Sequence, residues 1–471
     1  MAADIEKIQV ELSKVSPSFC IAKWSNVTVH LESGTTHSCH HPKVHRVPLQ
    51  ELKNNPAALH NTSFKVAQRK KMINGERPAE CDYCWRIEDL KKAQISDRYL
   101  KSAADWSENL ISDILKDPLH PGYLPRYLEV SFSNKCQFKC SYCTAEQSSS
   151  WEEELTQFGN YPNNTGRKIN RIIPEDINPY VKSFWEWWPE LSTRLQNFRI
   201  TGGEPLLSPN SFRVLEDLLV HPRPQLSIGI NSNLGAPKVI IDKFVKLIAE
   251  LETKACVREI IIFPSIDAFG KQAEYIRHGL KEKYFWDNIK LILNSTNSAG
   301  ISIMCTFNAL SITTFRALFD EVVLLNRAYQ SPVRKKPVLL DVAYLRNPDQ
   351  QSVKALPQSY LVPMAEIVTH IEANTDMLAS GERRYSLELI KTRRILEYMK
   401  EPLSNRKKTR LQSDFYEFFS EHDRRRNTDF LKTFPEMQDF WDLCRKQRES
   451  PWRKFTVFFR DVINPMMQLI R

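Results

Sequence analysis

The sequence predicts an α/β protein built around a parallel sheet. Short apolar stretches typical of strands begin near Tyr127, Asn197, Leu226, Ile260, Ile301 and Val338. Amphipathic segments of helical period separate them, such as residues 212–219 and 315–323. Strands that alternate with helices form a parallel sheet with right-handed crossovers. We therefore expect six strand–helix units.

Length and periodicity divide the chain of 471 residues into three predicted domains, since a single domain usually has about 100–200 residues. Residues 1–100 carry four cysteines and few strong helical patterns. Residues 101–345 hold the strand–helix units. Residues 346–471 are helical and rich in aromatic side chains, and we expect them to form an interaction surface or a cap over the open end of the sheet domain.

Three cysteines follow the first strand of the sheet domain. Residues 127–132 alternate apolar and polar side chains, and Cys136, Cys140 and Cys143 lie in the next loop, where α/β folds usually place their chemistry. Three thiolates at this spacing can hold three corners of a cubane iron–sulfur cluster. The run lacks a fourth cysteine, so one iron would accept a ligand that is not protein. Half of a zinc site is the alternative.

A glycine pair follows the second strand. The segment Gly202-Gly203-Glu204-Pro205 comes directly after the strand-like residues 197–201. Two glycines let the backbone approach a ligand closely, and a carboxylate suits an ammonium group. An ordinary turn is the alternative. The position of the loop, about one strand–helix–strand unit after the cysteines, favours a functional role.

Polar residues also close the next two strands. Asn231 ends one of them, and this side chain can reach a cofactor or cap the following helix. Ser265 and Asp267 end the other, and Arg277 follows Ser265 by twelve positions. The alternative for Arg277 is a solvated residue on a helix.

The cysteine run resembles the signature of the radical S-adenosylmethionine (SAM) enzymes, including the aromatic Tyr142 before the last cysteine. The glycine loop and the Ser265/Arg277 spacing are also similar to that family, and the resemblance covers residues 20 to about 345. It implies a partial (β/α)6 TIM-like barrel in which Cys136, Cys140 and Cys143 hold a [4Fe-4S] cluster that binds SAM. The cofactor-binding residues it implies are Tyr142, Gly202, Gly203, Glu204, Asn231, Ser265, Asp267 and Arg277.

The resemblance also assigns contacts within SAM. The glycine loop would bind the amino group of the methionine part, and Arg277 its carboxylate. Ser265 would contact the ribose, and the backbone near Tyr142 the adenine. An electron donor such as flavodoxin or ferredoxin is the partner that such an enzyme needs.

Four more cysteines precede this loop, namely Cys20, Cys39, Cys81 and Cys84. Four cysteines with one CxxC pair suit a structural zinc site, and the histidines within residues 37–45 could add nitrogen ligands. The pattern, with Trp24 and residues 72–76, resembles the twitch domain, a short form of the SPASM domain. That resemblance implies a second, auxiliary [4Fe-4S] cluster. The twitch segment usually follows the SAM domain, whereas here it precedes it.

Composition limits the class of protein. Hydrophobic residues make up 42% of the chain and aromatic residues 10%, as in a folded protein. We find no signal peptide and no apolar run that could span a membrane, and free cysteines suit a reducing compartment, so we expect a cytoplasmic protein without membrane contact. The net charge of +10 includes basic runs at 406–410, 424–426 and 445–448. They could bind nucleic acid, but solvated helix faces are favoured.

The resemblance implies a radical SAM enzyme that reductively cleaves SAM to a 5′-deoxyadenosyl radical for hydrogen abstraction. By resemblance to twitch and SPASM enzymes, a peptide or protein is the leading substrate class. Radical modification of a small molecule or nucleotide is the first alternative. The second is a zinc-stabilised nucleic-acid-binding protein without catalysis, against which the glycine loop and the Ser265/Arg277 pair argue.

Overall fold

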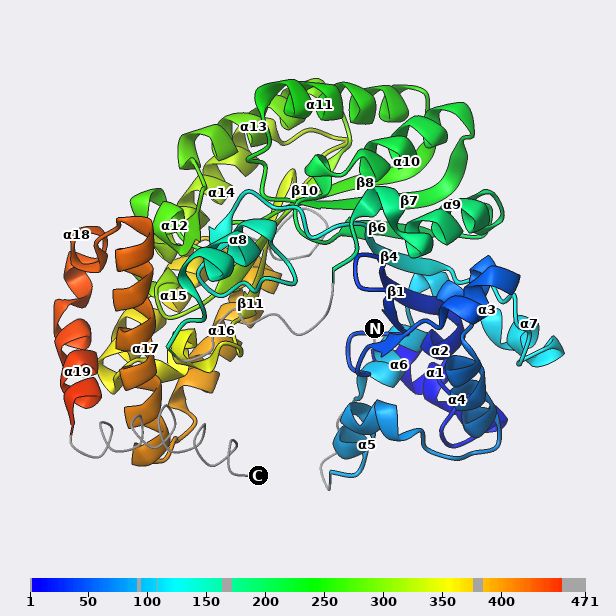
Figure 1. The fold of residues 1–471 in the computed structure, drawn as a ribbon, viewed down its shortest axis with the longest axis horizontal. Coiled ribbons are helices and arrows are strands. Elements are labelled where there is room, and N and C mark those ends of the chain that lie inside the picture. Colours follow the sequence, from blue (N-terminus) through cyan, green and yellow to red (C-terminus); the bar gives the residue numbers. More distant parts are fainter. Residues whose placement is uncertain (1, 91–94, 108, 163–171, 376–383, 451–471) are drawn as a thin grey trace. The chain divides into compact units, whose positions relative to one another are not determined.

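The computed structural model describes residues 2–90, 95–107, 109–162, 172–375 and 384–450 (Figure 1). The last part of the predicted helical region, residues 451–471, lies outside these ranges. The chain forms two compact units. The first comprises Met1–Lys135, Asn170–Asn231 and Asp242–Ile261, and the second comprises Cys136–Ile169, Ser232–Ile241 and Ile262–Arg471.

The first unit is built on a sheet in the order β8-β7-β6-β4-β1-β2-β3. Its strands are β1 (Asn26–His30), β2 (Thr35–His37), β3 (His45–Arg46), β4 (Tyr127–Ser131), β6 (Asn197–Thr201), β7 (Arg223–Ser232) and β8 (Val257–Pro264). The neighbours β1, β4, β6 and β7 pair in parallel, so that Val29 lies opposite Val130 and Val130 opposite Ile200. These three side chains are buried, which places the apolar core along the middle of the sheet.

Helices α9 (Pro179–Leu191), α10 (Pro209–Val220) and α11 (Lys238–Thr253) lie along one face of β6, β7 and β8 (Figure 1). Helix α9 begins where Asn178 accepts hydrogen bonds from the backbone N–H groups of Tyr180 and Val181. Its buried Trp188 packs against Phe198 of β6, with 5.1 Å between ring centroids. An aromatic helix face therefore covers the sheet and keeps water from the strands.

The N-terminal segment surrounds its own small core. Its helices are α1 (Ala2–Val15), α2 (Ala22–Ser25), α3 (Leu49–Asn54), α4 (Ser63–Ile73), α5 (Asp82–Glu88), α6 (Asp97–Ser102) and α7 (Leu110–Lys116). Phe19, Trp24, Met72 and Trp85 are buried together in it. Neither these helices nor the strands β1–β3 were expected from the residue pattern, and β1 joins the sheet beside β4.

In the second unit the end of β8, then β10 (Gly300–Phe307) and β11 (Val338–Tyr344), lie side by side, and β10 and β11 pair in parallel. A two-stranded antiparallel sheet joins β5 (Lys139–Cys140) to β9 (Arg277–His278). The helices are α8 (Ser149–Phe158), α12 (Gly270–Ile276), α13 (Glu282–Ser295), α14 (Phe315–Tyr329), α15 (Leu361–Ala373), α16 (Ser386–Lys400), α17 (Asn405–Arg426), α18 (Phe430–Thr433) and α19 (Gln438–Glu449). Figure 1 shows α17 alongside α19.

The α/β class and the parallel sheet are confirmed. Within the described residues, β3 and β11 each have one neighbouring strand, so the sheet does not close on itself. The partial (β/α)6 barrel therefore stays a prediction. In the same residues, no helix combines the length and the apolar character needed to cross a membrane.

Candidate functional site

The loop of Cys136, Cys140 and Cys143 is held by hydrogen bonds to its backbone. The N–H of Cys143 donates to the carbonyl of Cys140 over 3.0 Å, and the indole of Trp151 donates to the same carbonyl over 2.8 Å. The Ser148 hydroxyl donates to the carbonyl of Phe138. Cys140 is buried, while Cys136 and Cys143 are partly exposed. The loop thus has a backbone fixed by hydrogen bonds.

Arg277 lies opposite Cys140 because the two residues are register partners in the β5/β9 pair. Its Nη1 is 3.7 Å from Cys140 Sγ. Its Nε is 2.8 Å from Asp267 Oδ2, and its Nη2 donates to Asp267 Oδ1 over 3.1 Å. The hydroxyl of Tyr142 also donates to Asp267 Oδ2, over 2.7 Å. Four predicted site residues therefore meet in one buried cluster, and the solvated alternative for Arg277 is wrong.

Burial and charge act against each other in this cluster. Burial alone would lower the pKa of the Arg277 guanidinium, but Asp267 holds it well above its ordinary value. Burial raises the pKa of the Cys140 thiol, and Arg277 counteracts this rise. Burial also raises the pKa of Cys143, to about 12. Both thiols are therefore protonated at neutral pH unless a metal binds them.

Of the two asparagines near the end of β7, it is Asn233 that meets the cysteine loop. Asn233 is buried, its Nδ2 is 3.7 Å from Cys136 Sγ, and its Oδ1 accepts a hydrogen bond from Gln137 over 3.0 Å. Asn231, which the sequence analysis preferred, lies in the first unit, and its Oδ1 accepts from Arg199 Nε over 2.8 Å. Ser265 lies in the second unit and its N–H donates to the carbonyl of Ser232. Residues two positions apart lie on the same face of a strand, so alternation alone does not distinguish Asn231 from Asn233.

The glycine loop closes over the segment that leads into the cysteines. The N–H of Gly203 donates to the carbonyl of Ser133 over 3.0 Å, and that of Glu204 to the carbonyl of Lys135 over 2.6 Å. A Cβ at Gly203 would collide with the carbonyl oxygens of Lys135 and Asn134. The Gly202/Gly203 pair therefore permits close contact with the protein's own backbone, while the predicted approach to a ligand stays a prediction. The buried Glu204 carboxylate accepts a hydrogen bond from the N–H of Leu206 over 3.1 Å, at the start of a short 3₁₀ helix.

The four N-terminal cysteines line one small cavity of about 30 Å³ in the first unit, although they come from distant parts of the sequence. The ammonium of Lys23 is 3.5 Å from Cys81 Sγ. Burial and the neighbouring thiols of Cys39 and Cys81 raise the pKa of Cys20 to about 12. His41 also lines the cavity and is 2.6 Å from Asp97 Oδ2. The expected convergence of the four cysteines is therefore present.

The donor sets suit iron–sulfur clusters. Thiolates are their protein ligands, and N–H groups beside the sulfurs tune them. Arg277 and Asn233 supply such groups at the loop, and the Lys23 ammonium does so at the N-terminal cavity. Across the described part of the chain, no three His, Cys, Asp or Glu side chains stand together as ligands of a single metal ion. The four N-terminal cysteines share one cavity of the first unit.

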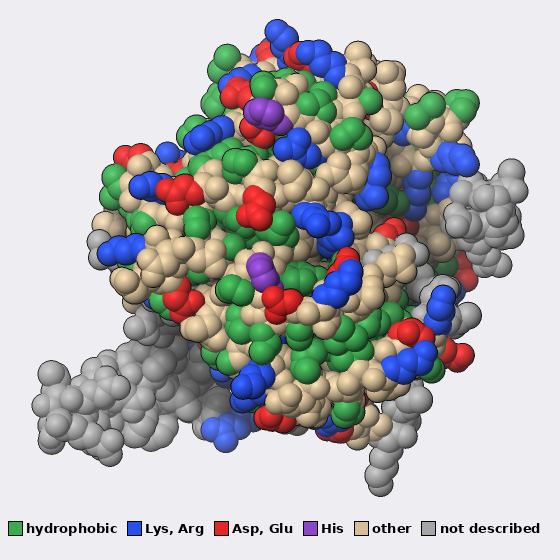
Figure 2. Space-filling view, turned by 90° about the vertical axis from the view of Figure 1, so that its right-hand side faces the viewer, with side chains coloured by type: hydrophobic (Ala, Val, Ile, Leu, Met, Phe, Trp, Pro, Cys, Tyr) green, Lys and Arg blue, Asp and Glu red, His purple; other side chains and the backbone are tan. Residues whose placement is uncertain are grey.

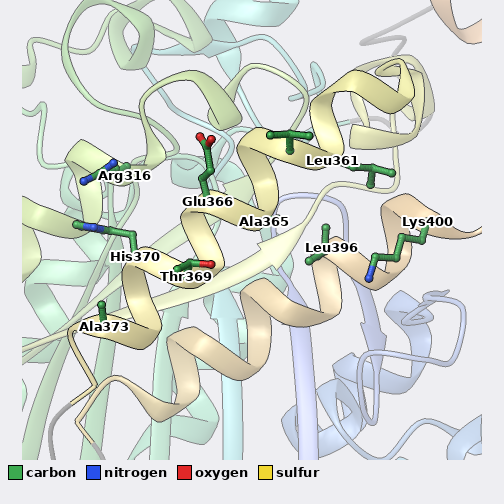
Figure 3. A pocket seen from close by; sticks show the side chains of 10 residues that line it. Arg316, Leu361, Ala365, Glu366, Thr369, His370, Ala373, Leu396 and Lys400 are labelled. Atoms are coloured by element: carbon green, nitrogen blue, oxygen red, sulfur yellow. The ribbon is translucent and has the colours of Figure 1, made fainter.

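A separate groove of about 710 Å³ lies between α15 and α16 (Figure 3). Leu361, Ala365 and Thr369 of α15 and Leu396 and Lys400 of α16 border it. None of the predicted site residues lines it.

Two arginines of the basic runs form ion pairs with carboxylates. Arg426 has a fully buried side chain paired with Glu154, and Arg410 is paired with Asp349 and Asp414. Figure 2 draws another face of the molecule, on which Lys and Arg side chains are interspersed with Asp and Glu. At Arg426 and Arg410 the ion pairs favour a structural role over contact with nucleic acid.

Comparison with known proteins gives partial matches to enzymes, and no family model matches the chain. The chain is 27% identical over 177 residues to a GTP 3′,8-cyclase of Trichodesmium erythraeum, which is 37% of this chain and 43% of that protein. It is 29% identical over 105 residues to the GTP 3′,8-cyclase of Streptomyces coelicolor, which is 22% and 25% of the two chains. A third such cyclase, from Microcystis aeruginosa, is 29% identical over 92 residues, 20% of this chain and 22% of that one. The matches thus cover less than half of these relatives.

Proposed function

We propose that this protein is a radical SAM enzyme. The observation that carries the proposal is the cluster of Cys140, Tyr142, Asp267 and Arg277, because the residues that the signature singles out meet in one buried place. The matched cyclases are radical SAM enzymes, which supports the same chemistry. When bound by Cys136, Cys140 and Cys143, a [4Fe-4S] cluster supplies the electron that cleaves SAM reductively.

The protein side chains prepare this loop. Arg277 places a cation beside the Cys140 sulfur and favours its thiolate, and Asn233 directs an amide N–H at Cys136. Asp267 fixes the guanidinium and accepts the Tyr142 hydroxyl, so it acts as an anchor for both. We assign Arg277 to the SAM carboxylate. As the resemblance implies, Ser265 would contact the ribose.

The glycine loop has its own proposed role. We assign Gly202, Gly203 and Glu204 to the amino group of SAM, a role that rests on the resemblance and on the close approach that the two glycines permit. Backbone hydrogen bonds tie the loop to Lys135, the residue before Cys136. The loop therefore also fixes where the cysteine segment begins.

We propose a second [4Fe-4S] cluster at Cys20, Cys39, Cys81 and Cys84. A tetrahedral zinc ion, with Zn–S distances of about 2.3 Å, would draw its four sulfurs to within about 4 Å of one another. The four thiols border a common cavity, and the likeness of their spacing to the twitch domain favours an iron–sulfur cluster over zinc there. Such a cluster could accept or relay an electron or bind substrate.

Two substrate classes follow from different observations. The twitch-like cysteines support a peptide or protein substrate, since many twitch and SPASM enzymes modify peptides or proteins. The printed name of the matched relatives gives GTP as the substrate of those proteins, and this favours a nucleotide as the second candidate. The zinc-stabilised nucleic-acid-binding alternative is weakened by the buried pairing of Arg426 and by the Arg277 cluster.

The test is anaerobic reconstitution followed by reduction in the presence of SAM. Wild-type protein is expected to release 5′-deoxyadenosine and methionine, and Cys140→Ala to release neither. Cys444→Ala, which removes a buried thiol of α19, is the matched control and should keep activity. Parallel assays contain either GTP or a peptide library. The substrate class is the one whose addition increases the release of 5′-deoxyadenosine. Equal cleavage by the Cys140→Ala variant and wild type would end the assignment.

A further inference from the structure

The run Arg424-Arg425-Arg426 at the end of α17 contains three arginines with different surroundings. Arg424 is exposed and pairs with Glu421 of the same helix. Arg426 has a side chain that is 0% exposed and reaches the region of the cysteine loop. A guanidinium wholly removed from water is stable only when its N–H groups are paired. The partners of Arg426 therefore indicate its role.

The partners of Arg426 belong to α8 and β5. Its Nε and Nη2 donate to the two carboxylate oxygens of Glu154, over 3.0 and 3.2 Å. Its Nη1 donates to the carbonyl of Lys139 over 2.6 Å. Glu154 is itself 1% exposed and also contacts Lys139 Nζ at 2.8 Å and the Tyr161 hydroxyl at 2.7 Å. Although burial favours the neutral acid, these hydrogen bonds hold the pKa of Glu154 at about 2.

Hydrogen bonds from several elements hold the peptide groups on both sides of Cys140. The carbonyl of Lys139, which precedes it, accepts from Arg426. The carbonyl of Cys140 accepts from Trp151, and the Arg426 guanidinium lies over the Trp151 ring at 5.0 Å from its centroid. The N–H of Ser141, which follows, donates to the carbonyl of Ile276 over 2.8 Å. A metal-binding loop held this way keeps the direction of its central thiol fixed.

We propose that helix α17 is a clamp for the cysteine loop and that Arg426 is its positioning residue. The C-terminal region is then a built-in support of the loop and not only a cap or an interaction surface. That Arg426 restrains the loop follows from the contacts alone. That this restraint helps the loop to hold an iron–sulfur cluster rests on the proposed function.

Hydrogen–deuterium exchange on the full-length protein without metal tests the restraint directly. In Arg426→Met, the amides of Ser141 and Cys143 should exchange about ten-fold faster than in wild type, because the backbone bonds they make open more often. Peptides from β4 and β6 should be unchanged. Arg424→Met, in the same run of the same helix, should behave as wild type throughout. Unchanged exchange at the two loop amides in Arg426→Met would overturn the proposal.

Two further variants separate the clamp from general folding. Glu154→Gln keeps shape and volume but loses the charge, and Arg426→Lys keeps the charge but cannot bridge Glu154 and the Lys139 carbonyl at once. These two variants serve as the test if Arg426→Met does not fold. In both, the loop amides should exchange faster than in wild type but more slowly than in an unrestrained loop. Wild-type exchange rates in both variants would overturn the clamp. After reconstitution, these variants should retain less iron than Arg424→Met. If wild type fails to cleave SAM, the proposed function fails while the exchange result still decides the clamp.

Discussion

Nη1 of Arg277 lies 3.7 Å from the Sγ of Cys140, inside a protein core that also buries Asp267. The contact follows from the backbone, since β9 places Arg277 opposite Cys140 in β5. A cation beside a thiol favours the thiolate, which is the form that binds iron. The cysteine loop therefore carries its own counter-charge, and Asp267 keeps that charge in place.

Arg277→Ala should weaken SAM binding and destabilise the fold. Loss of a charge-assisted contact costs about 1.5–3 kcal/mol, so SAM affinity should fall about ten-fold or more, as measured by equilibrium binding to the reconstituted protein. Removing the partner of the buried Asp267 should lower the free energy of unfolding by about 3–5 kcal/mol. In a double-mutant cycle, Asp267→Ala added to Arg277→Ala should cost less than the sum of the single changes. Wild-type SAM affinity in Arg277→Ala would contradict the assignment.

Gly203→Ala should disturb the start of the cysteine loop. The new Cβ would collide with the backbone carbonyls of Asn134 and Lys135, and backbone cannot move aside as a side chain can. Such overpacking costs about 1–3 kcal/mol of unfolding free energy, to be measured by urea denaturation. Gly122→Ala is the matched control, because the nearest atom to its Cβ is the His120 side chain at 3.1 Å. Equal stability of the two variants would show that the glycine loop is an ordinary turn.

The strands that build the sheet could be predicted from sequence, because their apolar period is local information. The expected starts at Tyr127, Asn197 and Val338 coincide with β4, β6 and β11. Strand β1 was missed, because its five residues owe their place to parallel pairing with β4, about 100 positions along the chain. Pairing between distant segments leaves no local pattern.

The same reason explains the site residues that sequence reasoning misjudged. Arg426 stands in a basic run and resembles a solvated helix end, since its partner Glu154 lies 272 positions away. Asn231 was among the predicted cofactor-binding residues and Asn233 was not, because two residues near one strand end differ only in the neighbours that the fold supplies. Cys140 and Arg277 were expected in one site from spacing and residue type, and the fold brings them within 3.7 Å of each other, while their roles stay predictions.

Iron content should distinguish one cluster from two. Reconstituted wild type should bind about eight irons per chain, and a Cys81→Ala/Cys84→Ala variant about four, since each cubane holds four. The variant should still cleave SAM if Cys136, Cys140 and Cys143 act alone in that step. Iron, sulfide and zinc are measured on the same samples. Four irons with one zinc in the wild type would keep the proposed enzyme but remove the auxiliary cluster.

Stability should fall as pH decreases from about 6.5 towards 5, and His422 should contribute to this change. His422 is fully buried in α17, and burial together with Arg426 lowers its pKa to about 3, although Asp423 acts in the opposite direction. In the unfolded chain the same imidazole has a pKa of about 6.5, so below that pH the unfolded state binds a proton that the folded state does not. The folded state therefore loses stability as pH falls, by about 2 kcal/mol at pH 5 for this group.

The variant His422→Gln isolates this contribution, because glutamine does not titrate. The free energy of unfolding is measured by urea denaturation between pH 5 and 7, and the variant should show a shallower pH dependence than wild type. Glu154 does not interfere in this window, since its pKa of about 2 in the fold affects stability only below its unfolded value of about 4.3. His221→Gln, at an exposed histidine, is the control and should keep the wild-type slope. An identical slope in His422→Gln and wild type would mean that His422 binds its proton equally well in the folded and unfolded states.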